Sequence, residues 1–190
     1  PRGNDADISV NMMSISLGNA GGNQSLFVGG NFESRIWNGR HFIDVFNIAR
    51  YDLVSNKWGP LGGYPLLDEN NLTKRVVVTV ASYDDYHKEL YVGGAFQIST
   101  NSNFAALDYG GDEHASVGKS TGVTSVGLAL WSVTIGLQPF TGGSLQTLPG
   151  YSHHQRLVHL YYDGSIMSLF VGGQFQLEGK PQCRQVAVWF

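Results

Sequence analysis

The chain has 190 residues, of which 42% are hydrophobic and only 14% are charged, with a formal net charge of −3. This length and apolar content are enough for one folded domain with its own core. Because no cluster of Lys or Arg occurs, we expect neither nucleic acid nor an anionic membrane surface as a partner, and no apolar run approaches the roughly 18 residues that span a bilayer.

A short apolar stretch that contains a glycine pair occurs three times, at residues 25–32, 89–96 and 168–175. The apolar residues before each pair are continuous, which is typical of a strand buried on both faces. Glycine suits a position where two backbones approach closely or where φ is positive. We therefore predict three equivalent buried strands, with a structural role for Gly29, Gly30, Gly93, Gly94, Gly172 and Gly173.

Each of these strands is flanked by further strand-like pieces in a fixed order. An entry strand comes first, at residues 12–17, 76–81 and 157–161, and an alanine-centred strand ending in Tyr or Trp follows, from residues 47, 127 and 186. The first two units add a short exit strand. Counting ten residues back from each glycine pair aligns Asn19 with Tyr83 and Tyr162. Turn residues separate the pieces and no helical periodicity is present, so the chain is predicted to be all-β.

Short antiparallel strands that recur at intervals of more than about 50 residues are typical of β-propeller blades. Residues 1–190 are therefore predicted to form a partial β-propeller of four-stranded antiparallel blades. Blade 1 is expected at about 11–63, blade 2 at about 75–143, and an incomplete blade 3 at about 156–190. Two and a half blades cannot close a ring, so further blades of the same chain or neighbouring copies are expected to cover the open faces.

The repeated Val-Gly-Gly-x-Phe pattern is followed in the first unit by an Ile-Ala-x-Tyr-Asp stretch at 48–52 and by Lys-Trp-Gly-Pro-Leu at 57–61. This order resembles the kelch-type propeller repeat, especially the variant in fungal cortical cell-polarity marker proteins and related extracellular propellers. The second unit diverges, with Trp131, Ser132 and Gln138 at matching positions. The resemblance implies a propeller that binds proteins or glycans at an extracellular or cell-surface location, and it implies no particular reaction.

Two N-x-Ser/Thr sequons begin at Asn23 and Asn71. Both fall in turn-like segments between predicted strands, where a glycan could project into water. Together with the low charge, they favour a glycoprotein that has passed through the secretory pathway, although sequons also arise by chance.

The connections between the second and third strands of the units differ most in length. From glycine pair to aromatic residue they measure 21, 37 and 16 residues, and insertions in a repeat fold emerge on one face, often the binding face. The first connection carries residue types enriched at binding hot spots, namely Trp37, Arg40, His41 and Phe42. These residues are candidates for a partner-binding loop, and packing over the end of the blade is the alternative.

Other residues that could carry chemistry lie in unfavourable patterns. Ser120 lies in a Gly-Lys-Ser-Thr-Gly stretch without the following helix that a nucleophile elbow needs. The acidic cluster of Asp108, Asp112 and Glu113 lacks the regular spacing of a calcium loop, and His153, His154 and His159 are too extended to share one metal ion. We therefore expect no metal and no cofactor.

A single cysteine, Cys183, excludes an intrachain disulfide. The main hypothesis is a non-enzymatic structural or interaction module of an extracellular glycoprotein, with protein or glycan partners. The alternative is a propeller segment of a carbohydrate-active or oxidative enzyme whose catalytic residues lie outside this segment.

Overall fold

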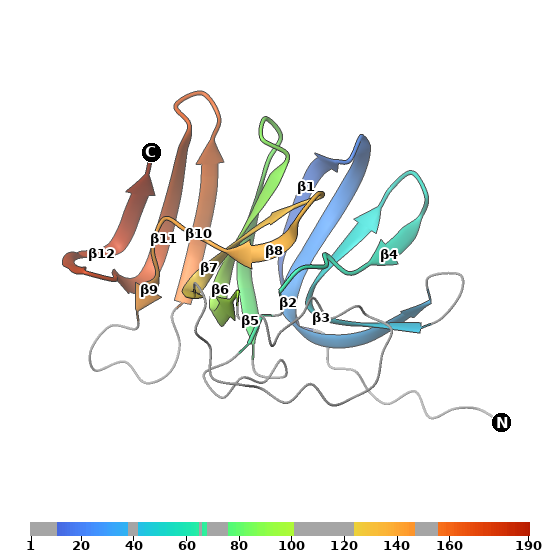
Figure 1. The fold of residues 1–190 in the computed structure, drawn as a ribbon, viewed down its shortest axis with the longest axis horizontal. Coiled ribbons are helices and arrows are strands. Elements are labelled where there is room, and N and C mark those ends of the chain that lie inside the picture. The colour runs from blue at the N-terminus through green and yellow to red at the C-terminus, as the bar shows by residue number, and fades with distance from the viewer. Residues whose placement is uncertain (1–10, 38–41, 65, 68–75, 101–123, 147–155) are drawn as a thin grey trace.

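The computed structural model describes residues 11–37, 42–64, 66–67, 76–100, 124–146 and 156–190. These residues form strands and turns, with no helix among them, so the all-β prediction is confirmed in the part described. Three antiparallel sheets stand side by side in the order of the chain (Figure 1). The first strands of the three sheets, β1 (Asn11–Ala20), β5 (Val77–Asp84) and β10 (Arg156–Asp163), are neighbours in space.

Sheet 1 has the strand order β1-β2-β3-β4, with β2 (Asn23–Trp37), β3 (Phe42–Asp52) and β4 (Lys57–Gly59). Sheet 2 has the order β5-β6-β7-β8, with β6 (Glu89–Ser99), β7 (Thr124–Ser132) and β8 (Gly136–Pro139). Sheet 3 has the order β10-β11-β12, with β11 (Ser168–Leu177) and β12 (Lys180–Trp189), and the short β9 (Leu145–Gln146) pairs with the end of β11. The strand with the glycine pair is an inner strand of every sheet.

The hairpin turns determine how the entry strands align. Gly21 and Gly22 form a two-residue turn with φ of 64° and 86°, values that glycine adopts without strain. The corresponding turns in sheets 2 and 3 have four residues, and each follows an aspartate whose carboxylate accepts a backbone N–H two residues later, Asp84 from Tyr86 and Asp163 from Ser165.

Although the first turn is two residues shorter, the β1–β2 hairpin has two more residue pairs than the others, so eight residues separate Leu17 from Leu26 and only six separate Tyr83 from Leu90. Counting back from the glycines therefore misaligns sheet 1. Leu17 faces Leu26 in the register in which Tyr83 faces Leu90 and Tyr162 faces Leu169. Leu17 is therefore the structural counterpart of the two tyrosines, and the alignment of Asn19 with them is wrong.

Glycines on the inner strands let neighbouring sheets come close together. A Cβ atom on Gly29 would lie 2.5 Å from Cγ1 of Val78 in sheet 2, and one on Gly93 would lie 2.6 Å from Cδ1 of Leu157 in sheet 3. Neither glycine has a positive φ. Of the two reasons for glycine suggested by the sequence, close approach is the one that applies at these two positions.

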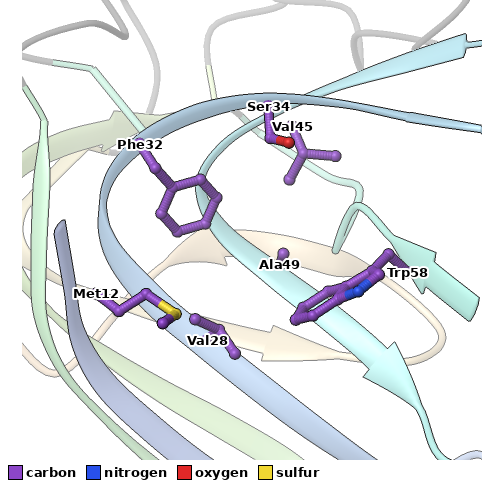
Figure 2. Close-up of a pocket in the computed structure, with 7 residues that line it drawn as sticks. All are labelled: Met12, Val28, Phe32, Ser34, Val45, Ala49 and Trp58. Carbon is purple, nitrogen blue, oxygen red and sulfur yellow. The ribbon is translucent and has the colours of Figure 1, made fainter. Parts of the chain in front are cut away.

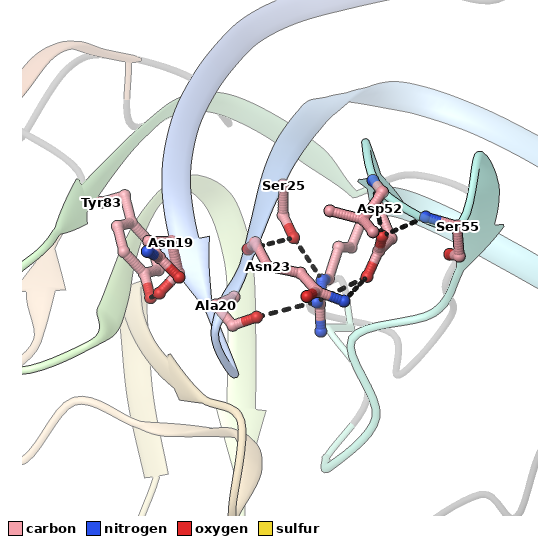
Figure 3. Close-up of polar contacts among 9 residues, drawn as sticks. Asn19, Ala20, Asn23, Ser25, Asp52, Ser55 and Tyr83 are labelled. Atoms are coloured by element: carbon pink, nitrogen blue, oxygen red, sulfur yellow. Dashed lines mark hydrogen bonds and ion pairs between the residues drawn. The ribbon is translucent and has the colours of Figure 1, made fainter.

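Aromatic stacking repeats between the sheets. The Phe27 and Tyr83 rings stack between sheets 1 and 2 with centroids 5.2 Å apart, and Tyr91 and Tyr162 stack between sheets 2 and 3 at 5.3 Å. The Tyr83 hydroxyl also donates a hydrogen bond of 2.9 Å to the carbonyl of Asn19 (Figure 3). Burial raises the pKa of Tyr83 to about 12, so this hydroxyl stays protonated at neutral pH.

The segment that leaves each sheet is fastened to the next one. The indole N–H of Trp131 donates to the carbonyl of Leu61, and that of Trp189 donates to the carbonyl of Gly142, both at 2.7 Å. Farther along, Leu67 exchanges two backbone hydrogen bonds with Gln97 on β6, and β9 pairs with the equivalent end of β11. The inner strands of sheets 2 and 3 are thus each paired near one end with chain from the preceding unit.

We predict that Gly29→Ala destabilises the protein by about 1 to 3 kcal/mol, because the added methyl group would overlap the stiff, buried side chain of Val78. Gly172→Ala is the matched control, since Gly172 holds the same place in β11 and a Cβ there would meet nothing closer than 3.5 Å. Urea unfolding of both variants at low protein concentration measures the difference. Equal effects on the free energy of unfolding would contradict the role assigned to Gly29.

Candidate functional site

A polar network joins the β1–β2 turn to the end of β3 (Figure 3). Arg50 donates from Nε to the hydroxyl of Ser25 at 2.9 Å and from Nη2 to the carbonyl of Ala20 at 3.0 Å. Its Nη2 also lies 3.4 Å from a carboxylate oxygen of Asp52, which accepts a hydrogen bond of 2.9 Å from the side-chain amide of Asn23. Residues of three strands, β1, β2 and β3, thus converge on this one cation and anion.

Asp52 also organises the turn that follows β3. Its Oδ1 accepts the backbone N–H groups of Val54 and Ser55 at 2.9 and 2.8 Å. The hydrogen bond from Ser55, followed by that from Asn23, lowers the pKa of Asp52 to about 2, since both favour the charged carboxylate. The network therefore depends on the ionised form of Asp52.

The first sequon lies inside this network. Asn23 begins β2 and is partly exposed, whereas Ser25 of the same sequon is fully buried beneath Arg50. N-glycosylation replaces one of the two amide hydrogens of Asn23 and leaves one N–H donor on that side chain. The fold is thus compatible with a glycan at Asn23. The second sequon, at Asn71, lies outside the described residues.

A separate apolar hollow lies on the face of sheet 1 that points away from sheet 2 (Figure 2). Its volume is about 180 Å³, and its lining consists of Met12, Val28, Phe32, Ser34, Val45, Ala49 and Trp58. The hydroxyl of Ser34 is the one polar side-chain group in this lining apart from the indole N–H of Trp58. The hollow is smaller than a usual small-molecule site and lacks charge, so it suits apolar side chains better than a polar substrate.

Ionisable side chains also gather between sheets 2 and 3. Nδ1 of His87 lies 2.5 Å from a carboxylate oxygen of the buried Asp84 and 3.2 Å from the hydroxyl of Tyr162. Burial raises the pKa of the nearby Glu89 carboxyl and of the Tyr91 hydroxyl. Because Asp84 and Tyr162 contact the same ring nitrogen, His87 cannot pass a proton between them as a histidine bonded through both nitrogens does. This arrangement ties two sheets together.

The predicted partner-binding loop lies at the end of a long hairpin. β2 and β3 stay paired from Glu33 and Phe46 to Trp37 and Phe42, and they run out past the rest of the sheet (Figure 1). The side chain of Phe42 is 60% exposed. Arg40, His41 and the side chain of Trp37 lie outside the described residues.

Several other residues singled out from the sequence also fall outside the described part: Asp108, Asp112, Glu113, Ser120, His153, His154 and the side chain of Cys183. His159 is exposed on β10. Within the ranges that the structure describes, no group of three or more His, Cys, Asp or Glu side chains is placed to hold a metal ion.

Sequence reasoning named Asn23 but missed Arg50 and Asp52. Residues two apart on a strand share a face, so the sequence does place these two side chains together. Their partner Ser25 comes from another strand, through the pairing of Ser25 with Asp52. Only the register of β2 against β3 reveals the cluster.

We predict that Asp52→Asn removes part of the pH dependence of stability. A carboxyl whose pKa is lowered in the folded state stabilises the fold above its unfolded pKa of about 4, and the contribution is lost as the pH falls toward the folded value of about 2. The stability advantage of the parent protein over the variant should therefore be full at neutral pH and shrink between about pH 4 and 2. Unfolding curves recorded at several pH values measure it, and a constant difference would contradict the assignment.

The described residues include no helix that is long and apolar enough to cross a membrane. No protein-family model, curated protein or solved structure matches the chain. The arrangement of the sheets and their side chains is therefore the basis for assigning a function.

Proposed function

We propose that this chain is a run of kelch-like propeller blades that acts as a structural and interaction module of an extracellular or cell-surface glycoprotein. Its partner is a protein or a glycan, and binding occurs at the loops between the second and third strands. The module is proposed to be non-enzymatic, with a scaffold of stacked sheets that positions these loops.

The observation that carries the proposal is the long β2–β3 hairpin. The first three strands of each sheet share one topology, so the connections between second and third strands leave from the same edge of the stack (Figure 1). In sheet 3 this connection is the tight turn at Glu178 and Gly179, whereas in sheet 1 the two strands extend well beyond the glycines. Variation confined to one edge of a regular scaffold is typical of a recognition surface.

The chemistry of the hairpin supports recognition. Phe42 presents a large aromatic side chain at its described end, and aromatic rings provide much of the binding energy at interfaces. Arg35 and Asp44 form an exposed ion pair of 2.8 Å farther back along the hairpin. An exposed pair of this kind adds little stability, but it can orient an approaching polar partner.

The extracellular assignment is supported by the low charge of the chain and by the placement of its first sequon. Asn23 follows the turn at Gly21 and Gly22, is partly exposed, and keeps one amide N–H when glycosylated. A hydrated glycan there would add solubility to a surface with few charged groups.

We predict that Phe42→Ala and Trp37→Ala weaken partner binding without unfolding the protein. The test compares both variants with the parent protein on a glycan array and against extracted cell-surface proteins. Ile135→Ala is the control, because Ile135 is also exposed but lies in the β7–β8 turn at the opposite end of the strands. Loss of about 1 kcal/mol or more of binding free energy in the hairpin variants alone is expected. Unfolding of these variants, or equal binding by all four proteins, would contradict the proposed site.

We predict N-linked glycan at Asn23 and Asn71 in protein isolated from its native source. Glycopeptide mass spectrometry before and after enzymatic deglycosylation measures the occupancy of each site. Ser25→Thr keeps the first sequon and should keep its glycan, whereas Ser25→Ala should lose it. If both asparagines are bare in native material, the extracellular assignment loses its main support.

A further inference from the structure

The contacts between sheets have a direction. We call the face of a sheet that points toward the preceding sheet of the chain its leading face. The opposite face, which points toward the following sheet, is its trailing face. Between sheets 1 and 2, the leading side chain Val78 lies over the trailing Gly29, and Tyr83 stacks on Phe27. Between sheets 2 and 3, Leu157 lies over Gly93 in the same way, so one interface geometry is used twice.

The leading face of sheet 1 has the same design but no described sheet against it. By register, Met12 is the counterpart of Val78 and Leu157, since each faces the second glycine of its pair just before a bulge. Val78 and Leu157 are 0% and 1% exposed, whereas Met12 is 59% exposed. Ile15 and Leu17, farther along the same strand, are also exposed.

The apolar hollow belongs to this leading face. Val28 and Ala49 in its floor are the counterparts of Val92 and Ala129, which sheet 2 buries against sheet 1. Met12 and Trp58 stand at its sides in Figure 2. The hollow therefore lies in a face that has the residues of a sheet-to-sheet interface but no described sheet packed on it.

The trailing face of sheet 3 is open in the complementary way. Val186 is the counterpart of Ile48 and Leu128, and it is 64% exposed, whereas they are 4% and 1% exposed. A Cβ on Gly172 would meet only atoms of sheet 3 itself, with none closer than 3.5 Å. Gly172 is thus the one glycine of the series Gly29, Gly93 and Gly172 that has no side chain of a following sheet over it.

We propose that the leading face of sheet 1 binds the trailing face of sheet 3 in a second copy of this chain. Met12 would then lie over Gly172, and Leu17 would contact Phe170 as Tyr83 contacts Phe27. The proposal deepens the proposed function, because it rests on the same stacking of repeated sheets. Sheets 1 and 3 stand at opposite ends of the row in Figure 1, with sheet 2 between them, so a single copy cannot make this contact by itself.

The shapes of the two faces favour this occupant over a symmetric pair. On the trailing face, the first glycine of the inner strand leaves space for a side chain of the next copy, whereas on the leading face the second glycine already faces Met12 of its own sheet. Two leading faces placed together would therefore bring Met12 against Met12. A head-to-tail contact leaves one free face of each kind and therefore adds further copies. The expected product is an open chain of molecules that lengthens with concentration.

Sedimentation velocity of the full 190-residue chain over a wide range of concentration tests the proposal. A leading-face variant carries Met12→Glu and Leu17→Glu, and a trailing-face variant carries Val186→Glu. The parent protein should form longer species as its concentration rises, while each variant alone should stay monomeric because its charge would be buried unpaired. An equimolar mixture of the two variants should form dimers and nothing larger, since each variant supplies the face that the other lacks.

Two further proteins separate loss of contact from loss of folding. Ile135→Glu places the same charge at an exposed position in the β7–β8 turn and should assemble like the parent. Gly172→Ala introduces no charge and should weaken association about tenfold or more, by overpacking against Met12 of the next copy. Circular dichroism and thermal melting confirm that each variant is folded.

Three results would overturn the proposal. The parent protein could be monomeric at every concentration, the trailing-face variant could still dimerise while the leading-face variant does not, or the mixture could fail to pair. Binding of glycan or protein through the β2–β3 hairpin is measured separately, so a monomer that still binds its partner would refute self-association and leave the proposed function standing. A protein that self-assembles but binds neither glycan nor protein through the hairpin would refute the proposed function and leave self-association standing.

Discussion

The fold depends on side chains of one sheet lying over glycines of the preceding one. Val78 over Gly29 and Leu157 over Gly93 bring the sheets close enough for aromatic rings to stack and for the exit segments to reach the next inner strand. Any side chain at these glycines would hold the sheets apart and expose the apolar faces of β2 and β6. The continuous apolar sequence of the inner strands is a direct consequence, because both of their faces are covered.

Much of this architecture could be predicted from the sequence. The inner strands are recognisable because burial on both faces removes the polar alternation of an ordinary antiparallel strand. The structural alignment of sheet 1 could not be predicted, because the β1–β2 hairpin has two more residue pairs than the β5–β6 hairpin, and these place Leu17 where counting places Asn19. The length of a hairpin is set by its own pairing, and a count from the glycine pair does not include it.

Of the candidate sites, too, some parts could be predicted from the sequence and others could not. Sequence motifs identify Asn23 as a glycan acceptor, and loop length draws attention to the β2–β3 hairpin. The bonds that join Arg50 and Asp52 to Ser25, Asn23 and Ala20 depend on strand register and cannot be read from the linear pattern. The apolar hollow is hidden for the same reason, since its lining comes from four strands and becomes a surface only when they are paired.

The exit segments have a consequence for synthesis on the ribosome. Leu67 is made before its partner Gln97, and β9 is made before β11, so each of these segments gains its backbone hydrogen bonds only after the following inner strand has been made. Gly62, Tyr64 and Leu67 bond to sheet 2, and Phe27 and Ile48 share one core with it, so the exit segment of sheet 1 becomes fixed together with sheet 2. The exit segments therefore couple the folding of neighbouring sheets during synthesis.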